Sequence, residues 1–178
     1  MSSVRCQVSR NSVERIAYRT GEHVVPTRDK LKVNIIVLNY NGKALLEECL
    51  PSLIHAAKKS QYHCRVWVID NASSDGSVEF LKTRFPEVKI DTRKDNTVLC
   101  AFNDFLKKSD EDISILLNND IKADENFVDA LVEVFYQHED ALLVVPKTMS
   151  FDGSVCENGR GKAKIKYAKH LLCRLGRW

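Results

Sequence analysis

The chain has 178 residues, of which 44% are hydrophobic and 29% are charged, and its formal net charge at pH 7 is +3. This length predicts about one domain with a sizeable core. A membrane-spanning or secreted chain is not expected: no apolar run approaches the roughly 18–20 residues of a transmembrane helix, and residues 1–30 lack the apolar segment of a secretory signal. The six cysteines contain no C-x-x-C pair. We therefore expect reduced thiols in a cytoplasmic protein rather than a zinc or disulfide framework.

The predicted elements alternate between strands and helices along most of the chain. Residues 1–31 are polar without a sustained period and are expected to form a loosely ordered extension. Continuous aliphatic and β-branched runs, typical of buried strands, lie at residues 33–38, 65–70, 88–91, 113–117 and 141–145. Helical spacing of apolar residues predicts helices at residues 44–59, 77–85 and 101–108, and one from an N-cap at Asp124 through His138. This alternation predicts an α/β fold with a doubly wound, mostly parallel sheet in a domain over residues 32–150.

Polar clusters follow three of the predicted strands, at residues 39–42, 70–76 and 118–120. In doubly wound sheets, ligands bind beyond the carboxyl ends of the strands, so the three clusters are expected to meet in one crevice. The chain has neither a G-x-G-x-x-G loop nor a G-x-x-x-x-G-K-[ST] loop, the two usual ways of cradling phosphates. A nucleotide bound here would need another counter-charge for its phosphates, and a divalent cation is the obvious candidate.

Asp120 is the candidate metal ligand, because it directly follows a buried strand at this crevice. Proteins typically hold Mg²⁺ with one or two carboxylates together with substrate phosphates and water. Asn118 and Asn119 can add amide oxygens or position a diphosphate. A strand-end turn is the alternative interpretation, since Asn and Asp favour such turns.

Asp70 and Asn71, at the end of the second strand, are candidates for binding a nucleoside. A carboxylate can accept hydrogen bonds from ribose hydroxyls, and an asparagine amide both donates and accepts, which suits the imide edge of uracil or thymine. Tyr40 offers an aromatic face for stacking on the base, although a partly buried loop aromatic explains it equally well. For Asp75 we favour a cap on the next helix over a role in binding.

Three stretches in this order resemble glycosyltransferase family 2. They are residues 33–42 (VNIIVLNYNG), residues 68–81 (VIDNASSDGSVEFL) and residues 115–120 (ILLNND), the last being a variant of the Asp-x-Asp metal motif of that family. The resemblance covers about residues 33–150. It implies a GT-A fold and transfer of a sugar from a nucleoside-diphosphate donor with inversion at the anomeric carbon. The motifs look like those of rhamnosyltransferase-like members, which implies a role in cell-surface polysaccharide or glycolipid synthesis.

The resemblance also implies roles for individual residues. Tyr40, Asp70 and Asn71 would hold the nucleoside, and Asp120 would bind Mg²⁺ or Mn²⁺, which acts as a Lewis acid on the leaving diphosphate. The complete predicted donor-binding set is Asn39, Tyr40, Asn41, Asp70, Asn71, Asn96, Asn103, Asn118 and Asn119.

Two departures from the family pattern bear on activity. The family usually has a glycine in the segment that aligns with residues 96–103, where this chain has Val98, while Asn96 and Asn103 match. Glycine permits close backbone approach to a ligand, so Val98 changes the fit of the donor. The family also supplies its general base from an acidic motif beyond the fifth strand, and no residue here matches that motif. We therefore expect a truncated or shortened acceptor region, and the catalytic base stays unassigned.

The last segment, residues 151–178, is a basic tail. Seven of the 27 Lys and Arg residues lie after residue 158, where no Asp or Glu occurs. Apolar residues at helical spacing within residues 162–178 allow a basic amphipathic helix that lies on an anionic membrane surface, which would place the protein at the inner face of the membrane beside a lipid-linked or saccharide acceptor. A solvated helix or disordered stub is the alternative. Nucleic acid is not an expected partner.

The expected donors are UDP-, dTDP- or GDP-linked sugars. Two other functions remain open. One is a non-catalytic module that binds nucleotide sugars without transferring them. The other is a nucleotidyltransferase that forms sugar nucleotides, but such an enzyme would carry a glycine-rich basic signature after the first strand, and residues 39–42 are not one.

Overall fold

The structure, a computed structural model, describes residues 4–6, 16–17, 31–138, 141–146, 148–150 and 155. Its centre is a four-stranded parallel sheet with strand order β5-β4-β3-β6. The strands are β3 (Lys32–Asn39), β4 (His63–Asp70), β5 (Lys89–Thr92) and β6 (Ile113–Asn118). They form because their aliphatic and β-branched side chains pack on both faces of the sheet, as expected for parallel strands covered on both sides.

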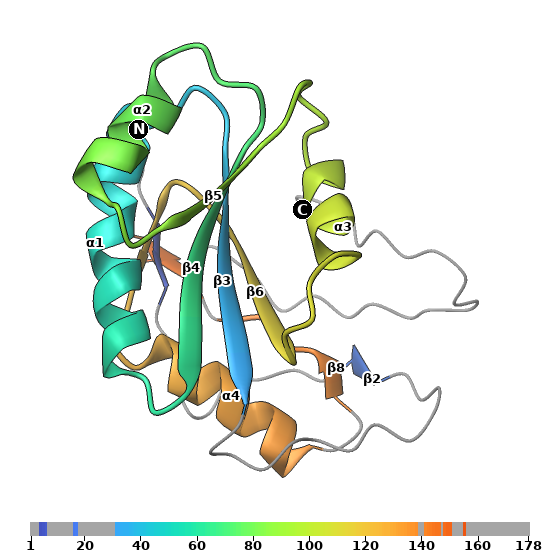
Figure 1. Cartoon of the computed structure of the whole chain (residues 1–178). Helices are drawn as coiled ribbons and strands as arrows, with labels where there is room; N and C mark the ends of the chain where they lie inside the picture. The colour runs from blue at the N-terminus through green and yellow to red at the C-terminus, as the bar shows by residue number, and fades with distance from the viewer. Residues whose placement is uncertain are drawn as a thin grey trace.

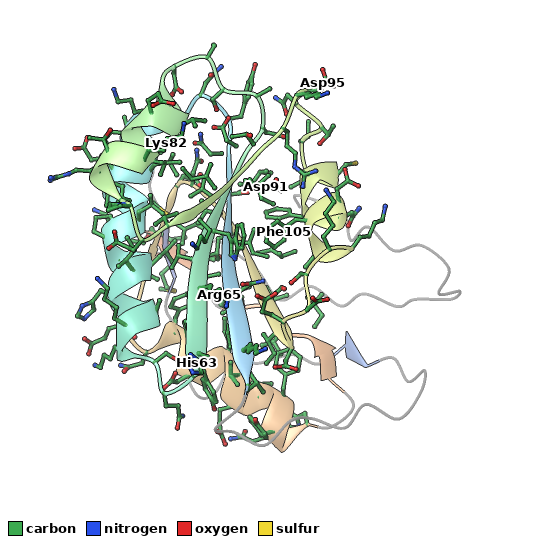
Figure 2. The ribbon with its side chains drawn as sticks, viewed as in Figure 1. His63, Arg65, Lys82, Asp91, Asp95 and Phe105 are labelled. Atoms are coloured by element: carbon green, nitrogen blue, oxygen red, sulfur yellow. The ribbon has the colours of Figure 1, made fainter. Side chains whose placement is uncertain are left out.

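Helices cover both faces of this sheet, which confirms the doubly wound α/β architecture (Figure 1). The helices α1 (Lys43–Lys59), α2 (Ser77–Arg84) and α4 (Phe127–Gln137) contribute to the larger hydrophobic core. The short helix α3 (Cys100–Leu106) covers the other face, where Phe105 reaches toward the sheet and lies 5.0 Å from the ring of Trp67 (Figure 2).

Strand alternation decides which face each strand-end residue occupies. In β3, Val33, Ile35 and Val37 belong to the core under α1, whereas Ile36 belongs to the core under α3. Side chains two residues apart share a face. Asn39 is therefore directed to the α1 face, and by the same count so is Asp70 in β4. Asn71, one residue further on, is directed to the α3 side.

A buried polar network also lies on the α3 face, at the amino-terminal half of the sheet. Asn34 is 1% exposed and donates to Ser109 Oγ (3.0 Å) and to Glu111 Oε2 (2.9 Å), while it accepts from Trp67 Nε1 (3.1 Å). Burial on its own raises the pKa of Glu111. Hydrogen bonds from Ser109 and Asn34 and the charge of Arg65 lower it, and the net result is a pKa below the usual value. These hydrogen bonds pair both polar atoms of the buried Asn34 side chain, which lies far from the carboxyl ends of the strands.

The expected fifth strand forms, but its place in the fold was predicted wrongly. Residues of β8 (Ala141–Leu143) pair antiparallel with β2 (Ile16–Ala17) and not with the four-stranded sheet. An apolar run indicates that a segment can form a strand, but it does not specify with which strand or sheet that segment pairs. Leu143 is 45% exposed, which also differs from the buried strand that we expected.

A second small sheet was not predicted at all. Directly after Asp120, β7 (Ile121–Ala123) pairs parallel with β1 (Val4–Cys6), and β1 also pairs antiparallel with β9 (Thr148–Ser150). Two short stretches of the predicted N-terminal extension thus have strand partners, while the division of the chain at residues 31 and 150 stays a prediction. The basic segment 162–178 lies outside the described residues.

The start of α4 also differs from the expected N-cap at Asp124. The helix begins at Phe127, and Asp124 instead forms the turn before it, accepting from the Asn126 N–H at 2.9 Å. Within the described part of the chain, no helix has both the length and the apolar character required to cross a membrane.

Candidate functional site

The carboxyl ends of β3, β4 and β6 meet at one edge of the sheet, as the sequence predicted. Asn39 pairs in register with Asp70, and Leu38 pairs with Asn118. Figure 2 identifies the two ends of the sheet: His63 lies at the amino-terminal end of β4, whereas Asp95 lies in the loop beyond the carboxyl end of β5. The loops 40–42, 71–76 and 119–120 consequently begin side by side.

Asn39 joins these loops through its side chain. Its amide nitrogen donates to Asp70 Oδ2 (3.0 Å) and to Ser73 Oγ (3.2 Å), and its amide oxygen accepts from Asn119 Nδ2 (2.8 Å). The Asn39 side chain is fully buried. A donor molecule therefore does not reach it in this structure, and its contribution is to hold the residues around it.

Asp70 is also buried, at 2% exposure, and holds its own loop. Besides the bond from Asn39, its Oδ1 accepts from the Ser73 N–H at 2.9 Å. Each carboxylate oxygen has two acceptor sites, so a further bond from a ribose hydroxyl remains chemically available. The assignment of Asp70 to the nucleoside stays a prediction.

Asp75 was expected to cap the next helix, but Gly76 is the N-cap of α2 and Asp75 lies one residue before it. Its carboxylate accepts from the Ser77 N–H (3.0 Å) at the start of α2 and from the Lys43 N–H (2.9 Å) at the start of α1. Burial on its own raises the pKa of Asp75, but the bond from the Ser77 hydroxyl and these two backbone bonds together outweigh it, so the pKa lies below its usual value. One carboxylate thereby ties together the helices that follow β3 and β4.

Asn71 faces the segment that follows β5. It is 1% exposed, and its amide nitrogen donates to Asn96 Oδ1 (2.7 Å) and to the Val98 carbonyl (3.3 Å). Its amide oxygen accepts from the Thr97 N–H at 3.4 Å. The Asn71 amide is thus occupied with positioning residues 96–98, and a direct contact with a base would have to replace one of these bonds.

Val98 occupies a backbone conformation that disfavours its residue type. Its φ is +50° and its side chain is 63% exposed. A β-branched residue with positive φ is a genuine outlier, because its side chain crowds the backbone. Hydrogen bonds at both Val98 backbone groups, to Asn96 and Asn71, hold this conformation. The position where the family usually has glycine therefore keeps a glycine-like backbone with a valine side chain.

We expect Val98→Gly to be more stable than Val98→Ala by about 1 kcal/mol, since only glycine adopts positive φ without crowding. This order reverses the usual one, in which alanine is the more stable residue. Urea denaturation of the two variants measures it. Leu99, whose φ is −64°, is the matched control, and there the alanine variant should be the more stable. The strain assignment is wrong if alanine is preferred at both positions.

Asp120 is half-buried and lies against α1. It lines a small pocket with Leu45, Glu48, Cys49, Asn119, Ile121 and Lys122. Burial raises the pKa of the Cys49 thiol, the Ile121 N–H lowers it and the charge of Asp120 raises it, and the net result is a pKa of about 12. In the metal-free protein Cys49 is therefore a neutral thiol at neutral pH.

The residues around Asp120 fit a cation that a substrate helps to hold. Within residues 31–138, 143–146, 148–150 and 155, no three His, Cys, Asp or Glu side chains are grouped so that they could bind a metal by themselves. A single carboxylate at a strand end suits Mg²⁺ or Mn²⁺, which bind one or two protein carboxylates and complete their shell with phosphates and water.

The remaining predicted residues differ in how they relate to this centre. Tyr40 is 51% exposed at the loop after β3, which leaves its ring accessible for stacking. Asn41 Oδ1 accepts from the Ser74 N–H at 2.7 Å, so its side chain connects two loops. Asn118 is exposed at the end of β6, and Asn103 is exposed on α3.

Two residues of the centre were missed from the sequence. Ser73 accepts from Asn39 Nδ2 and from the Asn41 N–H (2.9 Å), and so links the first two loops. A Cβ atom on Gly42 would lie 2.1 Å from Asn119 Nδ2 and 2.7 Å from Asn39 Oδ1. The Asn-Gly pair signals a turn, but only the structure shows that this glycine makes room for the Asn119 side chain.

Two solved structures of other proteins share this architecture. TarS from S. aureus, in complex with UDP-GlcNAc, matches with a TM-score of 0.52 and 20% identity, covering 61% of this chain and 32% of that chain. The mannosyltransferase PcManGT from Pyrobaculum calidifontis, in complex with GDP-Man and Mn²⁺, matches with a TM-score of 0.52 and 20% identity, covering 66% of this chain and 36% of that chain. These likenesses define the domain as a GT-A fold, and the match spans about a third of the length of either crystallised chain and 20% of the longer TarS chain.

The sequence comparison identifies the family. The profile described as "Glycosyl transferase family 2" matches residues 34–172, well over half of the chain. The chain belongs to glycosyltransferase family 2, as its three stretches indicated. No curated protein matches the sequence significantly.

Proposed function

We propose that this chain binds a nucleoside-diphosphate sugar together with Mg²⁺ or Mn²⁺ at Asp120 and transfers the sugar to an acceptor hydroxyl with inversion. The observation that carries the proposal is the hydrogen-bonded centre at the carboxyl edge, where Asn39 connects the Asp70 loop to the Asn119–Asp120 loop. A nucleoside at the Asp70 loop and a diphosphate at the Asn119–Asp120 loop are adjacent parts of one donor molecule.

The compared structures support the choice of ligand, since one contains UDP-GlcNAc and the other contains GDP-Man with Mn²⁺. When bound, the cation would stabilise the negative charge that develops on the leaving diphosphate. Asn119 would position the loop that carries Asp120, and Tyr40, with its exposed ring, would stack on the base. Asp70 and Asp75 are both engaged in holding loops, so neither is assigned as the general base.

The finer features of the function rest on the family pattern and the basic segment. Inversion at the anomeric carbon is inferred from the family pattern. An acceptor in cell-surface polysaccharide or glycolipid synthesis is inferred from the rhamnosyltransferase-like motifs. A lipid-linked acceptor would suit contact of residues 162–178 with the inner face of the membrane.

Calorimetric titration of UDP-, GDP- and dTDP-sugars, each with and without Mn²⁺, tests the proposal. We expect one donor class to bind, to bind more tightly with Mn²⁺, and to lose that gain when EDTA is added. Assays of transfer and of donor hydrolysis then follow on the same protein. Failure of every donor to bind in the presence of Mn²⁺ would exclude the proposed function. Binding without transfer or hydrolysis would instead support the non-catalytic module.

A further inference from the structure

Asn39 lies where the two halves of the proposed donor site meet. It is the last residue of the central strand β3, with β4 on one side and β6 on the other. Its side chain is fully buried, whereas Tyr40 and Asn41, the next two residues, are exposed. A buried amide at this position contacts protein groups and not the donor, so its effect on the donor passes through its neighbours.

The hydrogen bonds of this amide divide between the two halves of the site. Its nitrogen carries two N–H donors, and they go to Asp70 Oδ2 (3.0 Å) and Ser73 Oγ (3.2 Å) on the nucleoside side. Its oxygen accepts from Asn119 Nδ2 (2.8 Å) on the cation side, one residue before Asp120. The Asn39 amide is planar and rigid. If it rotates to keep its hydrogen bond to Asn119, its two N–H donors on the nucleoside side move as well.

The bridge between Asn39 and Asn119 also has little freedom to move toward α1. Both amides lie over the bare Cα of Gly42, with Asn119 Nδ2 only 2.1 Å and Asn39 Oδ1 only 2.7 Å from the position of a Cβ atom there. The backbone gives a second connection, since the Asn71 N–H donates to the Asn39 carbonyl at 2.8 Å. Packing and hydrogen bonds thus fix one geometry for the three loops.

We propose that Asn39 is a positioning residue that couples cation binding at Asp120 to nucleoside binding at Asp70. The proposal rests on the proposed function and adds how the two halves of its site communicate. A cation that orders the Asn119–Asp120 loop also orders the Asn39 amide, and with it the carboxylate of Asp70. The nucleoside then binds to a loop that is already ordered, and by linkage it strengthens cation binding by the same factor.

A free nucleoside is the probe that isolates this coupling. A nucleoside diphosphate touches the cation through its own phosphates, so its affinity depends on the cation whatever Asn39 does. Uridine, guanosine or thymidine lacks phosphates, and any gain in its affinity on adding Mn²⁺ passes through the protein. Because the cation at Asp120 needs phosphate ligands, inorganic pyrophosphate is present in every sample. Equilibrium dialysis with radiolabelled nucleoside, with and without saturating Mn²⁺, measures that gain.

We expect Mn²⁺ to raise nucleoside affinity about fivefold or more in the wild-type protein, the size of an ordinary coupling between sites. Asn39→Ala should abolish the gain. Asn119→Ala cuts only the cation side of the bridge, at a half-buried residue, and should abolish it too. This second variant keeps the test informative if Asn39→Ala does not fold.

Asn34→Ala is the matched control, because Asn34 is a buried asparagine of the same strand with hydrogen bonds to three residues at the other end of the sheet. It should lower stability but keep the gain. The proposal is overturned if the gain is unchanged in Asn39→Ala or Asn119→Ala, or if wild type binds a nucleoside diphosphate with Mn²⁺ yet shows no gain for the nucleoside. Absence of any nucleoside-diphosphate binding would exclude the proposed function first, and the coupling with it.

Discussion

Asp120→Asn is expected to abolish the gain in nucleoside-diphosphate affinity that Mn²⁺ provides. Affinity in the presence of Mn²⁺ should fall about 100-fold, or by roughly 2.8 kcal/mol. The substitution keeps the size of the side chain and deletes its charge. Because the described residues around Asp120 provide no cluster of three metal-binding side chains, no group of protein ligands replaces the lost carboxylate. The protein then contributes only a neutral amide oxygen, a weak ligand for a hard cation.

Without metal, the same variant should behave in the opposite way. An anionic carboxylate repels a diphosphate, so its removal should leave metal-free affinity unchanged or slightly higher. Calorimetric titration of wild type and variant, each with Mn²⁺ and with EDTA, measures both effects. Asp124→Asn removes the same charge four residues later, where the side chain holds a turn, and should change neither. A variant that keeps the Mn²⁺ gain would show that Asp120 is not the ligand.

The sequence predicted the position of this site because strand order and residue pattern agree. The aliphatic runs identified β3, β4 and β6. Parallel strands bring their carboxyl ends to one edge of the sheet, so Tyr40, Asp70 and Asp120, at or just after those ends, were expected to lie near one another. The two-residue period of a strand also predicts which face of the sheet a strand-end side chain occupies. Asn39 is in phase with Val33, Ile35 and Val37, which face the core under α1. That phase predicts a buried side chain, and the structure places Asn39 at full burial.

The rest depended on contacts between distant segments. Asn71 has the residue type of a base-reading side chain, but its amide is taken by residues 96–98, which lie about one strand and one helix further along the chain. The run at residues 141–145 predicted a strand without specifying that β8 pairs with β2. Burial and hydrogen-bond partners of this kind are set by tertiary packing, which local pattern and propensity do not encode.

Gly42→Ala is expected to disturb the site although the residue contacts no ligand. At φ −119° the backbone of Gly42 accepts any residue type, so the effect is steric. The new methyl group would lie 2.1 Å from Asn119 Nδ2. To remove this steric clash, the Asn119 side chain would have to rotate away and lose its hydrogen bond to Asn39. We expect a loss of about 1–3 kcal/mol in the free energy of unfolding. Displacement of the Asp120 loop should also lower Mn²⁺-dependent nucleotide affinity about tenfold, as a lost supporting contact of a metal ligand typically does.

A double-mutant cycle shows whether Asn119 is the group that Gly42 accommodates. In an Asn119→Ala background the closest atom is gone, so Gly42→Ala should cost less than it does in the wild type. Gly76→Ala is the matched control: its Cβ would meet nothing within 4 Å, and its cost comes only from a φ of +80°. That cost should be the same with or without Asn119. Denaturation curves of the five variants and the wild type give both cycles. Additivity of Gly42→Ala with Asn119→Ala would mean that the glycine is not needed to make room for this amide. Non-additivity confined to Gly42 would instead tie the small size of this residue to the geometry of the metal loop.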